Sequence, residues 1–501
     1  MAADKRILLI EPPFCRLFGA SYALPRYPLA LGYLAGTVQR ETNWEVMSYN
    51  ADFLPKAQPA TVRYLAGRGF EQYLANLRCP SGPVWQEVRD TIADFRPDVV
   101  GISSKTQNFA SAKLVAQAAK DVDPRIVVVV GGPHVSVAGV EVLECPHIDV
   151  AVRGEGERTI VDLLHAIARN ASLNAVDGII FRSNGTVAET RPRELISDLD
   201  SLCFPHQSAP AVLKDYHSYP LSAFRNIFAS RGCPFNCWFC GSRYLWTRSV
   251  RRRSVSSVIR EIQLLREAGL TSVHFSDDTF GVSKPYLHAL CGALREECPG
   301  LEWSCELHVN LVDDEAMHSM KSSGCTAIHM GIESGNNEIL KAIRKGFTIE
   351  KALAAAKTVK KHGLALHTFF MVGFPQETER SLRDTVTAIK ACDPYSVYYS
   401  IFTPYPGTEA FNTCKAMGLI PENFDISLYN HQSPANHFCA DIEPPRFREL
   451  AGEVERLVAH LNRRNAILRK LTPRSVGRTV KKLVELGPRE SFRRAASVLK
   501  H

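Results

Sequence analysis

Strand-sized apolar segments alternate with helical segments along most of this chain, in two successive series. The strand candidates of the first series are Ile7–Ile10, Val46–Tyr49, Asp98–Ser103, Ile126–Val130 and Val150–Val152. Strands that are apolar throughout and separated by helices are typical of a parallel sheet covered on both faces. We therefore predict an α/β fold that begins with a doubly wound, Rossmann-like domain, with a hairpin around Asn184-Gly185 at its end.

The second series contains six strand–helix repeats. Its strand candidates are Arg225–Ser230, Ser272–Ser276, Glu302–Glu306, Ala327–Ile332, Ala365–Val372 and Ser396–Phe402. Its helix candidates are Val255–Ala268, Lys284–Glu297, Asp313–Ser322, Glu338–Arg344, Ile349–His362 and Glu379–Ala391. Six repeats are too few for a full eight-stranded barrel. They predict a partial, open (β/α)6 barrel.

Composition shifts divide the chain into four parts. We assign residues 1–190 to the first domain, 191–223 to a Pro-rich linker lying over the surface, 224–410 to the partial barrel and 411–501 to a helical C-terminal region. A Pro-rich break is expected in that last region at Pro444-Pro445. At 45% hydrophobic and 22% charged residues, the composition is ordinary for a globular protein.

The net charge of +8 is concentrated at the C-terminus, where residues 462–501 hold twelve Lys or Arg and two Glu. We read this segment as a solvated helical tail, with peripheral contact to a membrane or an acidic partner as the alternative. We expect no nucleic-acid partner. No apolar run approaches the roughly 18 residues of a membrane span, and the polar N-terminus lacks a secretory signal. These features predict a cytoplasmic protein.

Three of the fourteen cysteines are clustered: Cys233, Cys237 and Cys240 form a C-x3-C-x2-C set. The set follows the first strand of the predicted barrel, and the carboxyl ends of barrel strands are where active sites form. Three thiolates can ligate three irons of a four-iron cluster, which leaves the fourth iron open for catalysis. Zinc is the competing metal, but its sites usually pair two such sets, and no fourth ligand is evident nearby.

These cysteines and the repeats after them closely resemble the radical S-adenosylmethionine superfamily, over about 225–410. The resemblance implies a [4Fe-4S] cluster on the three cysteines and S-adenosylmethionine cleavage at the open iron, giving a 5′-deoxyadenosyl radical. Further motifs at successive strand ends match the family's binding positions for S-adenosylmethionine. By this resemblance, the contacts are Phe239, Ser276, Asp277, Asp278, Glu306, Glu333, Ser334 and Gly373.

The first domain resembles the cobalamin-binding domain that precedes the barrel in many such enzymes. Three small-residue loops at strand ends carry this resemblance, and small residues let a backbone approach a bulky cofactor. The cobalamin contacts implied are Ser103, Ser104, Gly131, Gly132, His134, Gly154, Glu155 and Gly156. The loop after the first strand, Glu11–Arg16, has no His, so we expect cobalt to lack a lower imidazole ligand.

The resemblance implies an enzyme of class B type that methylates an unactivated carbon of a small molecule, using a 5′-deoxyadenosyl radical and methylcobalamin. Two alternatives stay open: a cyclase or oxidoreductase without net methyl transfer, and a non-catalytic corrinoid-binding sensor. The cluster also implies an electron donor such as flavodoxin or ferredoxin. The sequence does not select among secondary metabolites, tetrapyrroles and lipids as substrates.

Overall fold

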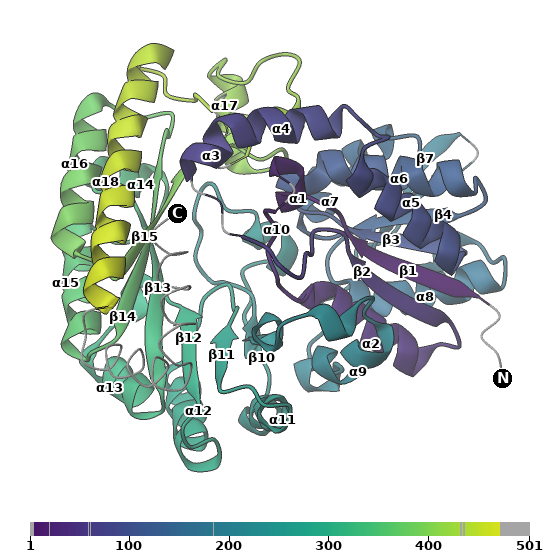
Figure 1. Ribbon diagram of the computed structural model, residues 1–501, viewed down its shortest axis with the longest axis horizontal. Helices are drawn as coiled ribbons and strands as arrows, with labels where there is room; N and C mark the ends of the chain where they lie inside the picture. Colours follow the sequence, from purple (N-terminus) through teal and green to yellow (C-terminus); the bar gives the residue numbers. More distant parts are fainter. Residues whose placement is uncertain are drawn as a thin grey trace, which may run out of the picture.

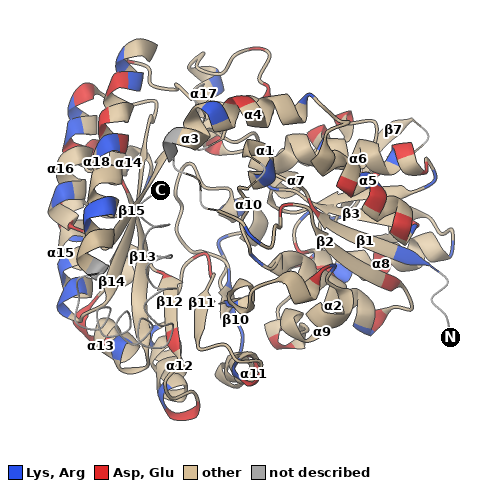
Figure 2. Ribbon diagram, viewed as in Figure 1, with Lys and Arg blue, Asp and Glu red and all other residues tan. Residues whose placement is uncertain are grey.

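The computed structural model describes residues 5–470, apart from 20, 59, 61, 184, 431–432 and 434–435. Two α/β units lie side by side in it, each built on its own sheet (Figure 1). Charged residues of both signs lie on the outward helices of the second unit (Figure 2). None of the helices in the described part of the chain is long and apolar enough to cross a membrane.

The N-terminal unit is a seven-stranded sheet in the order β2-β1-β3-β4-β5-β6-β7. Its strands are β1 (Arg6–Glu11), β2 (Glu45–Asn50), β3 (Val99–Ser103), β4 (Val127–Gly131), β5 (Val150–Val152), β6 (Ile179–Ser183) and β7 (Thr186–Glu189). The first five pair in parallel, whereas β6 and β7 form the antiparallel hairpin that the sequence predicts. The doubly wound fold is therefore confirmed.

Helices cover both faces of this sheet. They are α1 (Cys15–Phe18), α2 (Leu29–Glu41), α3 (Val62–Ala66), α4 (Arg68–Leu77), α5 (Pro83–Phe95), α6 (Phe109–Val122), α7 (Pro133–Ala138) and α8 (Gly156–Ala168). Within β1, Ile7 and Leu9 pack with residues of α2 and α8, while Leu8 and Ile10 pack with residues of α5 and α6. This alternation explains why four consecutive residues of the strand, Ile7–Ile10, are apolar. The sequence analysis did not anticipate α3, α4 or α5.

The second unit is a six-stranded parallel sheet in the order β15-β14-β13-β12-β11-β8. Its strands are β8 (Asn226–Ile227), β11 (Ser272–Phe275), β12 (Glu302–Glu306), β13 (Cys325–Glu333), β14 (Ala365–Val372) and β15 (Ser396–Ile401). The outer helices are α11 (Val255–Glu267), α12 (Lys284–Glu297), α13 (Asp314–Ser322), α14 (Asn337–Ala342), α15 (Ile349–Lys361) and α16 (Glu379–Cys392). Because β8 and β15 do not pair, the barrel is open, as predicted.

The first expected strand of the barrel is split. After β8, the chain forms β9 (Ser230–Arg231), which pairs antiparallel with β10 (Arg251–Arg252). The cysteine loop and the short helix α10 (Ser242–Trp246) lie between β9 and β10. The loop is thus closed at its base by a two-residue ladder.

The segment 191–223 does not simply lie over the surface, as we expected of a linker. It contains α9 (Pro205–Val212), which packs against α2. Val212 belongs to the core of the N-terminal unit, while Ala209 and Leu213 belong to the barrel core. The prolines hid this helix, because Pro205 stands at its first turn, where proline is tolerated.

The C-terminal region contains α17 (Glu409–Ala416) and α18 (Pro444–Lys470), and little helix between them. Pro444 and Pro445 begin α18 rather than break a helix, since a helix leaves its first backbone N–H groups unpaired anyway. Helix α18 packs on β15 and α16 (Figure 1). Most of the basic tail, from residue 471 on, lies outside the described residues.

Candidate active site

The three clustered cysteines lie at the carboxyl end of the barrel sheet, directly after β9. All three are free thiols of intermediate exposure. Burial raises the pKa of both Cys233 and Cys240 to about 11, so a bound metal is what would hold them as thiolates. Among the described residues, no His, Cys, Asp or Glu groups converge on a single metal ion. Each of the three thiolates could ligate a different iron of a cubane cluster.

Two adjacent aspartates brace the base of this loop. Asp277 accepts hydrogen bonds from the backbone N–H groups of Ala229 and Ser230, at 2.8 and 3.0 Å, and burial raises its pKa to about 7. Asp278 accepts from the N–H of Gly232 at 3.2 Å and from the Ser242 hydroxyl at 3.1 Å. Their carboxylates therefore hold both ends of the cysteine loop against the segment that follows β11.

A buried ion pair lies beside the cysteines. Glu333 ends β13 in the left-handed region, at φ 72°, and contacts the Lys345 ammonium at 3.3 Å. The pKa of Lys345 is raised by Glu333 and by nearby Cys237, against the effect of its burial. The sequence analysis missed Lys345, which follows α14 in a loop and has no motif around it. A cation here suits the carboxylate of a ligand or the negative charge of a cluster.

The other predicted S-adenosylmethionine contacts lie near the same edge of the sheet. Ser276 donates to the Asn226 side chain at 3.2 Å. Ser334 is fully buried and accepts from the N–H of Asn336. Gly373 has φ 98°, and half-buried Phe239 packs near Phe374, at 6.1 Å between ring centroids. Their roles in binding stay predictions, and Asp277 and Ser334 are already engaged by the protein itself.

The inner face of the open barrel carries an array of imidazoles that the sequence analysis did not single out. His274 on β11 lies 3.1 Å from the carboxylate of Glu306. Glu306 is the remaining predicted S-adenosylmethionine contact. The His329 and His367 rings stack across β13 and β14 at 4.4 Å, and burial lowers the pKa of His329 to about 4. Successive side chains of a strand point to opposite faces of the sheet. The residues next to these histidines are buried against the outer helices, so the imidazole rings point to the inner face of the barrel.

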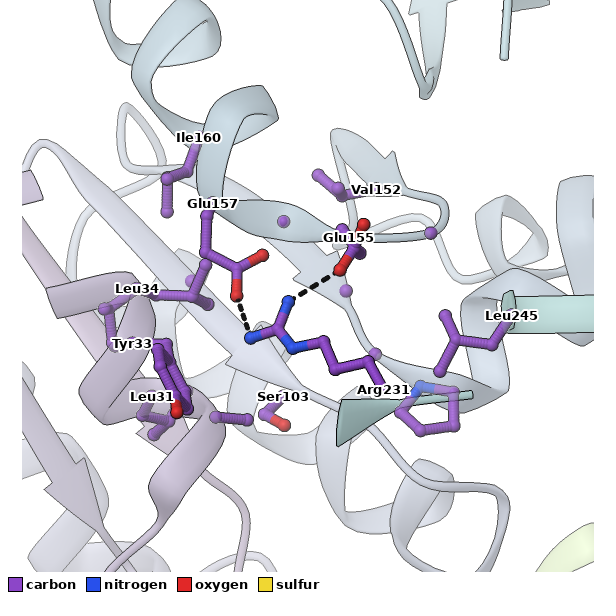
Figure 3. A pocket seen from close by; sticks show the side chains of 18 of the residues that line it. Leu31, Tyr33, Leu34, Ser103, Val152, Glu155, Glu157, Ile160, Arg231 and Leu245 are labelled. Atoms are coloured by element: carbon purple, nitrogen blue, oxygen red, sulfur yellow. Dashed lines mark hydrogen bonds and ion pairs between the residues drawn. The ribbon is translucent and has the colours of Figure 1, made fainter. Parts of the chain in front are cut away.

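A cavity of about 290 Å³ opens at the carboxyl edge of the N-terminal sheet. Its walls combine apolar side chains of β1, β4, β5, α2 and α8 with the small-residue loops (Figure 3). Six of the eight predicted cobalamin contacts line it: Ser103, Gly131, Gly132, Gly154, Glu155 and Gly156. A Cβ on Gly132, which has φ 106°, would lie 2.7 Å from the Ser104 carbonyl oxygen, so glycine is required there.

The other two predicted contacts do not line this cavity. Ser104 is fully buried and donates its backbone N–H to the Gly131 carbonyl at 2.8 Å. The His134 ring packs 4.1 Å from Phe109 and its Nδ1 lies 3.2 Å from the Thr106 hydroxyl. Burial lowers the pKa of His134 to about 4. The imidazole therefore turns into the domain core, away from the cavity.

The barrel supplies part of the same cavity wall. Phe228, Arg231, Leu245, Trp246 and Asp278 line it beside the glycine loops. Arg231 extends from β9 to contact Glu155 at 2.7 Å and Glu157 at 2.6 Å (Figure 3). The cavity and the cysteine loop are thus two neighbouring sites across one domain interface.

Comparison with known proteins agrees with this geometry. Residues 227–389 match the family model of the radical SAM superfamily, and residues 60–164 match that of the B12 binding domain. An uncharacterized methyltransferase of Pyrococcus horikoshii is 32% identical over 83% of this chain and 84% of its own length. The chain belongs to the cobalamin-binding radical S-adenosylmethionine enzymes.

Two further proteins resemble this chain at lower sequence identity. The cytidylyl-2-hydroxyethylphosphonate methyltransferase of Streptomyces wedmorensis is 28% identical over 85% of this chain and 84% of its own length. The fold is that of the radical S-adenosylmethionine methyltransferase TsrM from Kitasatospora setae, solved with cobalamin and a [4Fe-4S] cluster, at a TM-score of 0.62 and 18% identity. That match covers 82% of this chain and 78% of TsrM.

Proposed function

We propose that this enzyme transfers a methyl group to an unactivated carbon of a small molecule. The observation that carries the proposal is the cavity at the domain interface, whose wall is formed by both the cobalamin-type loops and the base of the cysteine loop. A methyl donor and a radical source must lie close together for such a transfer. When bound, S-adenosylmethionine at the cluster supplies a 5′-deoxyadenosyl radical and methylcobalamin supplies the methyl group.

Different residues of this chain would hold the iron–sulfur cluster and the cobalamin. Cys233, Cys237 and Cys240 would hold three irons, and Lys345 would place a positive charge beside them. The glycines of the cavity would let the corrin and its tail approach the backbone, and the apolar walls would exclude water. We propose that cobalt has no lower imidazole ligand from this chain, because the loop after the first strand, Glu11–Arg16, contains no His.

Two alternative functions differ in outcome. The anaerobic magnesium-protoporphyrin IX monomethyl ester cyclase of Rubrivivax gelatinosus is 28% identical over 75% of this chain, which keeps cyclisation as the second candidate. A corrinoid sensor is disfavoured, because a sensor has no use for three cysteines that leave an iron open. Mass spectrometry of extracts with and without the protein separates the first two: methylation adds one methylene unit, whereas oxidative ring closure removes two hydrogens.

Partners and location follow from the cluster and the charge. We propose an electron donor such as flavodoxin or ferredoxin, and a cytoplasmic location, which the fourteen free cysteines support. The basic tail would contact a membrane or an acidic partner only peripherally. These proposals rest on the electron demand of the cluster, the free cysteines and the positive charge of the tail.

The direct test is replacement of one cluster ligand. We expect Cys237→Ala, reconstituted anaerobically, to lose the cluster absorbance and to release no 5′-deoxyadenosine on reduction with dithionite. The wild-type protein should hold about four irons and sulfides. Cys79→Ala, at an exposed free thiol, is the matched control and should behave as the wild type. Unchanged 5′-deoxyadenosine release by Cys237→Ala would disprove the proposed function.

A further inference from the structure

A buried network of charges joins the two units where the cavity meets the cysteine loop. Arg231 lies at 8% exposure, with Glu155 and Glu157 at 7% and 6%. The Arg231 guanidinium donates through Nη1 to Glu155 and through Nη2 to Glu157 (Figure 3). One planar fork therefore binds two carboxylates of the other unit.

The network continues through the strand that pairs with β9. Arg251 on β10 donates to the second oxygen of Glu155 at 2.7 Å and to the Ile196 carbonyl at 2.5 Å. The Ile196 N–H in turn donates to Glu155 at 2.7 Å. Two arginines thus face two glutamates, so the charges of this buried network balance.

Arg231 lies between the cysteine loop and the loop that lines the cavity. The residue stands two positions before Cys233, and its neighbour Gly232 is fixed by Asp278 on the barrel side. Glu155 and Glu157 stand at the start of α8, directly after the glycine loop that lines the cavity. The cysteine loop is thus held between a carboxylate of the barrel and two carboxylates of the N-terminal unit.

We propose that Arg231 is a positioning residue that fixes the distance between the cluster and cobalamin. This inference rests on the proposed function, because it needs both groups to bind. Supporting residues hold a functional site to within about 0.5 Å, and Arg231 ties the start of the cluster loop to two glutamates beside the cobalamin loop. Lysine keeps the charge but cannot bridge two carboxylates as the guanidinium does.

The test compares Arg231→Lys with Arg253→Lys. Arg253 is equally buried and pairs with Glu261 of α11, but that pair lies wholly within the barrel and serves as the matched control. Each protein is loaded with cluster and hydroxocobalamin, and both groups are reduced to paramagnetic states. Electron paramagnetic resonance then measures the dipolar coupling between them, independently of any turnover.

We expect one narrow distance in the wild type and in Arg253→Lys. In Arg231→Lys, the distance should shift or spread by more than about 0.5 Å while iron and cobalamin contents stay at wild-type levels. Glu157→Gln, which removes one charge from the network, should show the same change and covers the case that Arg231→Lys does not fold. A wild-type distance in both Arg231→Lys and Glu157→Gln would overturn this inference but leave the proposed function standing. A wild-type protein that binds no cobalamin would overturn the proposed function, and this inference with it.

Discussion

Glu377 lies in the loop after β14, and its carboxylate is completely buried. One oxygen accepts hydrogen bonds from the N–H groups of Gly373 and Phe374, while the other has no partner. Burial raises the pKa of Glu377 to about 8. The folded protein therefore keeps this proton at neutral pH, although an exposed glutamate loses it near pH 4.5.

This proton makes stability depend on pH. Because the pKa is raised in the folded state, the stabilisation is fully present below the pKa of the unfolded chain and is lost as pH rises through about 8. Between pH 6 and pH 9 the loss is roughly 2 to 3 kcal/mol. Glu377→Gln cannot titrate, so its thermal midpoint should fall less than that of the wild type over this range.

Glu453→Gln, at an exposed position of α18, is the control for that measurement. Its pH dependence should match the wild type. Equal slopes for all three proteins would show that Glu377 does not hold a proton in the folded state.

At the scale of elements, α18 closes the edge of the barrel sheet. The Asn462 side chain accepts from the N–H of Val397 at 2.9 Å and donates to its carbonyl at 2.8 Å. The amide thereby replaces the neighbouring strand that β15 lacks. An open sheet edge otherwise presents unpaired backbone groups that can pair with another chain.

Loss of this amide should loosen the edge. We expect Asn462→Ala to lower the free energy of unfolding by about 1 to 3 kcal/mol, because two half-buried backbone groups lose their partners. Arg463→Ala, at the exposed neighbouring position, should change it by less than about 0.5 kcal/mol. Urea titrations followed by circular dichroism compare the three proteins, and equal midpoints would contradict this role of Asn462.

At the scale of the whole molecule, the cavity couples ligand binding to stability. A ligand that binds only the folded state at 100 times its Kd adds about 2.7 kcal/mol. The cavity offers a position to test this without disturbing the fold. A Cβ at Gly131 would meet only Val152, at 3.6 Å, which is an ordinary contact in the cavity wall.

We therefore expect Gly131→Leu to fill part of the cavity and weaken cobalamin binding at least tenfold, a cost of about 1.4 kcal/mol. Without cobalamin, its thermal midpoint should stay near that of the wild type. Hydroxocobalamin should raise the midpoint of the wild type and raise that of the variant much less. An equal rise in both would place cobalamin elsewhere.

Local patterns determined much of this protein. The alternation of strand and helix signals predicted both sheets, because burial on one or both faces of a strand leaves a pattern in its sequence. β12, β14 and α12 begin and end at the predicted residues. The spacing of the three cysteines and the glycines at strand ends predicted two candidate sites, and the structure places both groups of residues at the carboxyl edges of their sheets.

Only the tertiary structure decided which side chains pair near the two sites and which way they point. Arg231 meets glutamates 76 and 74 positions away, and Lys345 meets Glu333 only where a loop folds back beneath the cysteines. His134 stands in a glycine-rich loop, yet its ring turns into the core. Such pairings and side-chain directions depend on tertiary packing within and between the two units, and no local periodicity encodes that packing.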